Sequence, residues 1–213
     1  MTVVILANGE FPRKEYPLWL LRSADAVVCC DGAYNRKLEK LGVNPVAVVG
    51  DMDSLSASLK KNPGATLVRV DEQDFNDLNK AFIWVLDNYP EVSDIHILGA
   101  SGKSEAHTLG NLSYLLYWEQ EHKLSSRDIR VDMVSDYNTA FAVADSCELH
   151  VGEGRKVSLF SADQTLRIHS EGLRWPTDSV RFDFWFRATL NCATADMITL
   201  RFNHPAPVLV VLD

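Results

Sequence analysis

The sequence predicts an α/β fold class in which an N-terminal doubly wound parallel-sheet domain is followed by a small antiparallel β-sandwich domain. Before about Ser135, short apolar runs rich in β-branched residues alternate with helical patterns, as in doubly wound domains. After this point only short strand-like segments remain, separated by turn residues, as in antiparallel sandwiches. We therefore expect domains at 1–135 and 136–213.

The apolar runs of the first domain are nearly continuous, which is typical of parallel strands buried on both faces. They predict strands at 2–7, 26–30, 46–49, 66–70, 95–98 and 129–134. Two helices are expected between these strands because apolar residues recur on one face. The first starts near Asn76 and carries Leu78, Phe82, Val85 and Leu86, and the second follows His107 and carries Leu109, Leu112, Leu115 and Leu116.

The second domain is predicted from short β-rich segments bounded by turn sequences such as VGEGR and NHPAP. Strands are expected at 156–160, 165–169, 181–187, 197–202 and 208–212. The sequence shows no internal repeat and no long linker between the domains.

Composition limits the classes of partner. The 213 residues are 46% hydrophobic and 23% charged, which excludes disorder as the main state. The 21 basic and 29 acidic residues give a net charge of −8, which argues against nucleic acid or an anionic membrane as a partner. A phosphorylated small molecule is compatible with this charge if a divalent cation mediates.

No apolar run approaches the roughly 18 residues of a membrane span, and we interpret the opening MTVVILANGE as a first strand. The cysteines, Cys29, Cys30, Cys147 and Cys192, form no CxxC pair for zinc or redox chemistry. Free thiols in a reducing cytoplasm are therefore expected.

Polar side chains follow the predicted strands of the first domain. They are Asn8 after the first strand, Asp31 and Asn35 after the second, Asp51 and Asp53 after the third, and the acids of 71–77 after the fourth. The carboxyl ends of parallel strands meet at one edge of a sheet, where ligands bind. Clustered carboxylates repel one another unless a cation binds, and Mg²⁺ commonly bridges carboxylates to phosphates.

Spacing within this group supports a metal–phosphate site. Asp51 and Asp53 are two residues apart, so both carboxylates point the same way in an extended segment. Asp77 and Lys80 are three residues apart at a helix start and so share one helix face. The Asp77 carboxylate suits a metal, and the Lys80 ammonium suits a phosphate.

Ordinary structural interpretations exist for most of these residues. Asp31 before Gly32 fits a turn, and Asp74 or Asn76 fits a helix N-cap. Asp77 gains from the helix dipole, and Lys80 fits a solvated lysine. The shared sheet edge nevertheless favours Mg²⁺–phosphate chemistry.

The segment 99–103, GASGK, follows a strand and precedes a helix, as a phosphate loop does, but its glycines are too close for the full P-loop pattern. A glycine-rich turn is the alternative, with His107 on the helix surface and Asn111 facing solvent. In the second domain, Trp175 precedes a proline and has a face suited to a flat or cationic heterocycle. A core tryptophan is the alternative there.

Six motifs, in order and spacing, resemble those of thiamine pyrophosphokinases: ANG, DGAYN, VVGDMDSL, DEQDFNDLNKA, LGASGKSEAHTLGN and GLRWP. The resemblance runs from about Asn8 to Asn191. It implies a two-domain homodimer with its active site at the interface, which transfers a pyrophosphoryl group from ATP to thiamine with Mg²⁺.

Together with the resemblance, these residues give candidate roles. The catalytic candidates are Asp51, Asp53, Gln73 and Asp77, of which Asp51, Asp53 and Asp77 are the metal ligands. The nucleotide-binding candidates are Asp31, Asn35, Lys80, Lys103 and His107, and the thiamine-binding candidates are Trp175 and Asn191.

The chain departs from the family pattern in the loop after the fifth strand. The family usually has an arginine and then an aspartate before the histidine, where this chain has Ser104 and Ala106. A serine cannot supply the bidentate charge of an arginine. Lys103 and Glu105 are adjacent and offer partial substitutes.

Three functions follow. The first is a thiamine pyrophosphokinase, and the second is a weakly active or inactive relative that binds thiamine or a nucleotide. The third is a glycosyl- or nucleotidyltransferase that uses the Asp51–Asp53 pair as its metal site. The stretch 73–81 and the lack of sugar-nucleotide features count against the third.

Overall fold

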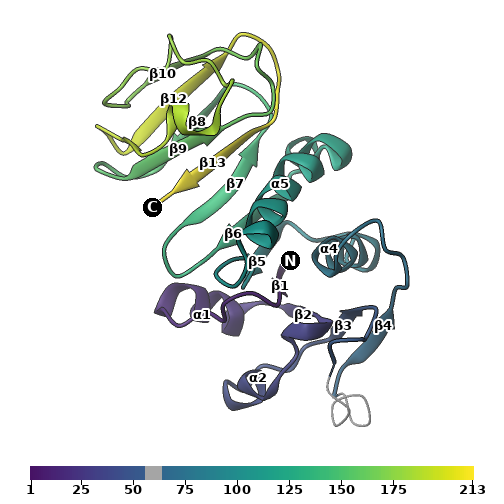
Figure 1. Cartoon of the computed structure of the whole chain (residues 1–213). Coiled ribbons are helices and arrows are strands. Elements are labelled where there is room, and N and C mark those ends of the chain that lie inside the picture. The colour runs from purple at the N-terminus through teal and green to yellow at the C-terminus, as the bar shows by residue number, and fades with distance from the viewer. Residues whose placement is uncertain (56–63) are drawn as a thin grey trace. The chain divides into compact units, whose positions relative to one another are not determined.

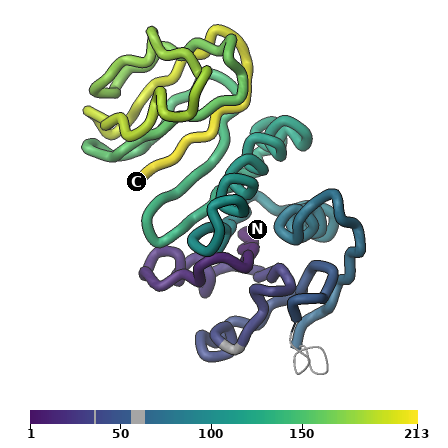
Figure 2. The backbone as a smooth tube through the Cα atoms, in the orientation of Figure 1, coloured from purple at the N-terminus to yellow at the C-terminus, as the bar shows by residue number. Residues whose placement is uncertain are grey.

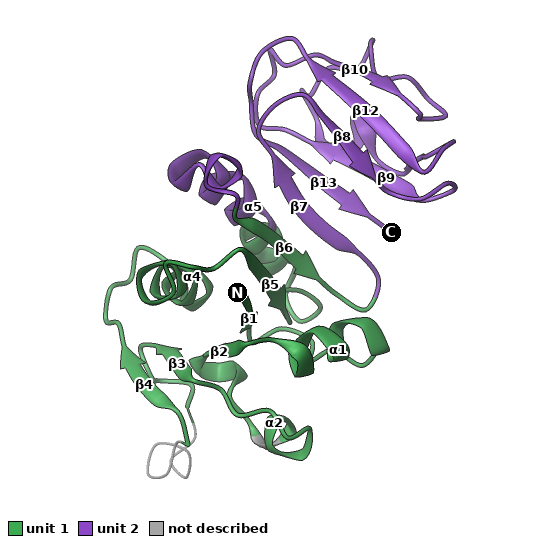
Figure 3. Ribbon diagram, turned by 180° about the vertical axis from the view of Figure 1, so that it is seen from behind, with its two compact units in different colours: residues 1–111, 129–136 green, residues 112–128, 137–213 purple. Residues whose placement is uncertain are grey.

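The computed structural model describes residues 1–55 and 64–213 (Figure 1). By its contacts, the chain divides into two compact units (Figure 3). The first unit comprises 1–111 with 129–136, and the second comprises 112–128 with 137–213. Among the described residues, no helix combines the length and the hydrophobicity that crossing a membrane requires.

The strands of the first unit all pair in parallel, and they confirm the predicted strands, each with its ends within one residue of the expectation. The strands are β1 (Thr2–Leu6), β2 (Ala26–Cys30), β3 (Ala47–Gly50), β4 (Thr66–Arg69), β5 (Asp94–Leu98) and β6 (Arg130–Val134). They lie in the order β6-β5-β1-β2-β3-β4. β1 and β2 are buried almost throughout, whereas β4 lies at the sheet edge and is only partly buried.

The helices begin where local chemistry favours a start. They are α1 (Glu15–Ser23), α2 (Arg36–Lys40), α4 (Asp77–Asn88) and α5 (Glu105–His122), with a 3₁₀ turn η1 at Asp31–Ala33. α4 starts as predicted after Asn76, whose Oδ1 accepts a hydrogen bond from the Asn79 N–H at 3.2 Å. The expected apolar stripe of α5 is partly wrong, because Leu109 is 48% exposed.

The strand order locates a crevice. The chain adds β2, β3 and β4 on one side of β1 and then returns through α4 to add β5 on the other side. This path can be followed by colour from the N-terminus in Figure 2. Right-handed crossovers therefore put α1 and α2 on one face and α4 on the other. The order reverses between β1 and β5, and ligands bind at such a switch point.

The second unit is an antiparallel sandwich, as predicted. Its strands are β7 (Thr139–Val143), β8 (Cys147–His150), β9 (Lys156–Phe160), β10 (Ile168–Glu171), β11 (Asn191–Cys192), β12 (Met197–Phe202) and β13 (Val208–Leu212). Within this unit they lie in the orders β11-β9-β13-β7 and β10-β12-β8. Buried residues from both sheets, such as Leu159 and Leu200, belong to one core cluster. A further 3₁₀ turn, η2, spans Leu124–Arg127.

Two strand expectations in this unit need correction. The segment 181–187 is not a strand: it runs into the 3₁₀ turn η3 (Trp185–Ala188). Its alternating aromatic residues predicted a half-buried strand. Of the three phenylalanines, Phe182 is buried, whereas Phe184 and Phe186 are 60% and 66% exposed. The strand expected at 165–169 starts later, at Ile168, because the preceding residues form a polar loop.

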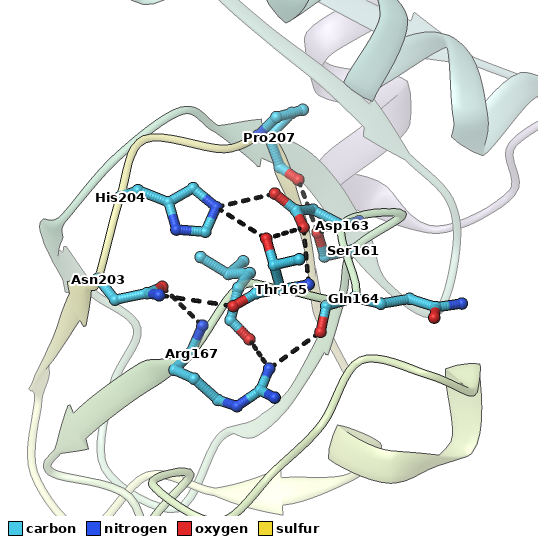
Figure 4. Close-up of polar contacts among 9 residues, drawn as sticks. Ser161, Asp163, Gln164, Thr165, Arg167, Asn203, His204 and Pro207 are labelled. Atoms are coloured by element: carbon cyan, nitrogen blue, oxygen red, sulfur yellow. Dashed lines mark hydrogen bonds and ion pairs between the residues drawn. The ribbon is translucent and has the colours of Figure 1, made fainter.

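That loop is held by a network of polar contacts (Figure 4). Asp163 contacts His204 Nε2 through Oδ2 at 2.8 Å and accepts the Thr165 hydroxyl through Oδ1 at 2.6 Å. The Ser161 hydroxyl donates to the Pro207 carbonyl at 3.2 Å. The loop 161–167 is thereby tied to the segment 203–207.

We expect Asp163→Asn to lower the melting temperature at pH 7 and to have little effect in acid. The contacts from His204 and Thr165 lower the pKa of the Asp163 carboxyl below its ordinary value. A carboxyl with a lowered folded-state pKa stabilises the fold above its unfolded pKa, and this contribution is lost as the pH falls through the folded-state pKa. Thermal denaturation of both proteins between pH 7 and pH 2 tests this, and a difference that stays constant with pH contradicts it.

Candidate functional site

A pocket of about 210 Å³ lies at the carboxyl ends of the strands of the first unit. The loops after β1, β2, β3 and β5 contribute to it, as do the first turns of α4 and α5. Its lining comprises residues 7–9, 30–31, 54, 76–78, 100–101, 103–104, 107–108 and 111. The pocket therefore occupies the switch point between β1 and β5.

Carboxylates converge beside this pocket because of strand register. Cys30 of β2 pairs with Val49 of β3, so Asp31 and Asp51 follow neighbouring strand ends. One carboxylate oxygen from each of Asp31, Asp51 and Asp53 lies within 4.8 Å of the others. Asp31 is 2% exposed, and its Oδ2 accepts a hydrogen bond from the Ser54 N–H at 3.3 Å.

Asp77 approaches the same cluster from the start of α4. Burial, then the charge of Asp31, raises the pKa of Asp77 to about 6; Asp51 adds to the rise and Lys80 opposes it. The Lys80 ammonium lies 3.5 Å from Asp77 Oδ1, and the Lys80 side chain is 4% exposed. The lysine is therefore a buried cation within the acidic cluster.

Gly50 permits the close approach of two of these acids. A Cβ at this position would lie 3.0 Å from Asp31 Cγ and 3.1 Å from Asp77 Cγ. The carboxylates of Asp31 and Asp77 thus lie on either side of Gly50, in space that the Cβ of any other residue at position 50 would occupy. Close acids of this kind suit a hard divalent cation with oxygen ligands, so the residues present fit Mg²⁺.

The geometry groups the acids differently from the sequence expectation. Asp51, Asp53 and Asp77 were the expected ligands, whereas the carboxylates that meet within 4.8 Å in the described part of the chain are those of Asp31, Asp51 and Asp53. The Asp53 N–H and the Gln73 side chain lower the pKa of Asp51, which keeps that carboxylate ionised. Gln73 therefore contacts the cluster from the segment between β4 and α4.

The loop 99–103 forms the opposite wall of the pocket. The Glu10 N–H donates to the Ser101 carbonyl at 2.7 Å, which joins this loop to the one after β1. The Lys103 ammonium donates to the Asn8 carbonyl at 2.8 Å and to Asn8 Oδ1 at 3.0 Å. Lys103 and His107 both line the pocket. Nucleotide binding by these two residues stays a prediction.

Ser104 has a structural role where the family pattern has an arginine. Its hydroxyl accepts a hydrogen bond from the His107 N–H at 3.3 Å, as an N-cap of α5 does. Ser104 thus caps the helix whose first turn lines the pocket.

Asn35 lies outside the pocket lining. Its Oδ1 accepts from the Lys37 N–H at 2.9 Å and its Nδ2 donates to the Ala33 carbonyl at 2.7 Å. The first of these contacts is the N-cap of α2. Nucleotide binding by Asn35 stays a prediction.

Trp175 and Asn191 come together in the second unit, beside a separate pocket of about 180 Å³. Asn191 Nδ2 donates to the Trp175 carbonyl at 2.6 Å, and Asn191 Oδ1 accepts from the Trp175 N–H at 3.1 Å. The Trp175 ring is not a core side chain, because the residue is 54% exposed. The Arg174 guanidinium lies 5.7 Å from the ring centroid.

Some pocket residues were not among the sequence candidates. Asn111, for which a solvent-facing position was the alternative left open, is 7% exposed, and Ser101 and Thr108 also line the pocket. The available signal was helical spacing, since Thr108 and Asn111 are three residues apart on one face of α5.

Comparison with known proteins gives a consistent result for both units. Residues 18–126 match the family model described as thiamin pyrophosphokinase, catalytic domain. Residues 139–208 match the model described as thiamin pyrophosphokinase, substrate-binding domain.

Individual relatives agree with the family models. The chain is 30% identical to thiamin pyrophosphokinase 1 of Caenorhabditis elegans over 124 residues, which cover 54% of this chain and 50% of the relative. It is 30% identical to thiamine pyrophosphokinase of Bacillus subtilis (strain 168) over 105 residues, which cover 47% of this chain and 44% of the relative. The chain thus aligns with about half the length of these curated relatives.

Solved structures share the fold. The crystal structure of thiamine pyrophosphokinase from Bacillus subtilis matches with a TM-score of 0.77 at 18% identity, covering 100% of this chain and 99% of the other. The solved structure of thiamin pyrophosphokinase from Candida albicans matches with a TM-score of 0.79 at 12% identity, covering 99% of this chain and 89% of the other.

Proposed function

Because the chain belongs to the thiamin pyrophosphokinase family, we propose that it transfers a pyrophosphoryl group from ATP to thiamine, with Mg²⁺ as cofactor. The observation that carries the proposal is the convergence of Asp31, Asp51, Asp53 and Asp77 beside the switch-point pocket. Thiamine supplies a hydroxyl whose oxygen attacks the β-phosphorus. The bond from this phosphorus to the α,β-bridging oxygen breaks, and AMP leaves.

The first unit supplies the nucleotide side of the reaction. Mg²⁺, held by Asp51 and Asp53 with Asp31 and Asp77 beside them, would neutralise phosphate charge. We assign Lys80 and Lys103 to the nucleotide phosphates, and Asp31, Asn35 and His107 to the other nucleotide contacts. Gln73 orients Asp51.

Asp77 is the proposed acceptor of the thiamine hydroxyl proton. Its pKa of about 6 leaves it ionised at neutral pH yet more basic than an ordinary aspartate. This proton affinity arises from burial and from the neighbouring acids.

The second unit supplies the thiamine side in this proposal. The exposed Trp175 ring offers a face to the flat, cationic thiazolium, and Asn191 holds the Trp175 backbone. The match of 139–208 to the substrate-binding model supports this role. We accordingly assign nucleotide binding and catalysis to 1–135, and thiamine binding and dimerisation to 136–213.

We further propose a cytoplasmic homodimer with its active site at the interface. Large exposed apolar side chains in the second unit support pairing of two copies: Phe184, Trp185, Phe186 and Leu190 are 60%, 59%, 66% and 58% exposed. The four cysteines are free thiols, as expected in a reducing compartment.

The test is to incubate the purified chain with ATP, thiamine and Mg²⁺ and to quantify AMP and thiamine diphosphate. We expect equal amounts of both products, none without thiamine and none with a chelator. Absence of both products overturns the proposal. Intact binding of thiamine or ATP by calorimetry would then identify an inactive relative, and Ser104→Arg with Ala106→Asp would be expected to create activity.

A further inference from the structure

Asn111 joins the two walls of the switch-point pocket through a pair of hydrogen bonds. Its Nδ2 donates to the Ala100 carbonyl at 2.7 Å, in the loop between β5 and α5. Its Oδ1 accepts from Asn76 Nδ2 at 3.0 Å, at the N-cap of α4. A single side chain thus links the loop 99–103 to the start of the helix that carries Asp77.

The chemistry of this link is specific to an amide. Asn76 Oδ1 is engaged with the Asn79 N–H, so Asn76 presents its NH₂ group to Asn111. Asn111 must therefore accept on one atom and donate on the other, and of the side chains of this length only asparagine does both. The residue is 7% exposed, so water competes weakly for these bonds.

The two joined elements carry different parts of the site. Asn76 immediately precedes Asp77, whose carboxylate belongs to the acidic cluster. The loop on the other side carries Lys103, whose ammonium is held by Asn8 at the pocket. Asn111 therefore constrains the separation between the acidic cluster and the loop 99–103.

We propose that Asn111 is a positioning residue for the pyrophosphoryl transfer, and this inference rests on the proposed function. By fixing the loop 99–103 relative to the N-terminus of α4, it aligns a nucleotide held by the loop with the acidic cluster. Loss of the link leaves each wall able to bind its part of the nucleotide but misaligns them. The expected signature is a lower kcat with little change in KM for ATP.

Two variants break the link from opposite ends. Asn111→Leu keeps the side-chain size and removes both hydrogen bonds. Asn76→Ser removes the NH₂ donor but keeps an oxygen that caps α4. A displacement of reacting groups by about 1 Å can cost about 100-fold, so we expect kcat to fall roughly 10- to 100-fold in each variant, with KM for ATP within about threefold.

The double variant separates positioning from a general structural effect. If both residues act through one link, Asn76→Ser in the Asn111→Leu background lowers kcat no further. Glu119→Gln is the matched control, because Glu119 is a 7% exposed polar residue of the same helix, and its carboxylate accepts from the Ser125 N–H away from the pocket. We expect this control to keep the wild-type kcat at a temperature where all variants are folded.

Hydrogen exchange supplies a readout independent of turnover. In the ligand-free protein, Asn111→Leu, which removes the hydrogen bond to the Ala100 carbonyl, is expected to speed exchange of the amides of 100–103 roughly tenfold, and Glu119→Gln to leave it unchanged. Wild-type kcat in both link variants, additive losses in the double variant, or unchanged exchange would each overturn the inference. If the wild-type chain makes no AMP, the proposed function fails, and the exchange experiment still decides whether Asn111 holds the loop.

Discussion

Asp51→Asn and Asp53→Asn should each lower kcat on the order of 100-fold or more, while the protein still folds. Each change keeps the shape of the side chain and removes a negative charge from a cluster whose oxygens lie within 4.8 Å of one another. Loss of a preorganised charge at a phosphoryl-transfer site costs several kcal/mol of transition-state stabilisation. Steady-state production of AMP at saturating ATP and thiamine measures the effect.

The control for these variants is Asp87→Asn. Asp87 is an exposed acid near the end of α4, in the same unit but remote from the cluster by position in the helix. It should keep the wild-type kcat, and all three variants should bind thiamine as the parent does. Near-normal turnover in both cluster variants would remove the metal assignment. A parallel Mg²⁺ titration should show that the cluster variants need more Mg²⁺ for half-maximal activity.

Gly9→Ala should destabilise the first unit and disrupt the pocket. A Cβ at Gly9 would overlap the main-chain carbonyl oxygens of Gly99 and Ser101, which join the loops after β1 and β5. Backbone atoms cannot rotate away as a side chain can, so the two loops must separate. Overpacking of this kind costs about 1–3 kcal/mol of unfolding free energy, occasionally more. Urea denaturation measures the loss, and nucleotide affinity by calorimetry should fall with it.

Gly110→Ala is the matched control for this substitution. Gly110 lies within α5, and a Cβ there meets no heavy atom within 4 Å. Alanine in a helix interior is more favourable than glycine by roughly 0.5–1 kcal/mol, so this variant should be as stable as the parent or slightly more so. Equal stability of the Gly9→Ala protein and the parent would show that the loops tolerate separation.

The strands of the parallel sheet were predictable because a strand buried on both faces must be apolar along its whole length. The run at 26–30 coincides with β2, and its five residues are all buried. The segment 181–187 shows the limit of this reasoning. Its residues alternate as those of a half-buried strand do, yet it runs into η3. An alternating segment becomes a strand only where a free strand edge is in reach, and local sequence does not encode that.

By itself, the sequence determined the fold class and the sheet edge at which acids gather, since both follow from local periodicity and from residues directly after strands. Only the tertiary structure decided which acids meet. Asp31 joins Asp51 because Cys30 pairs with Val49, a matter of register between separate strands. The tertiary structure likewise decided that Asn111 is buried, since its partners lie 35 and 11 residues away in the chain. Contacts at such separations depend on how whole elements pack, which local patterns do not specify.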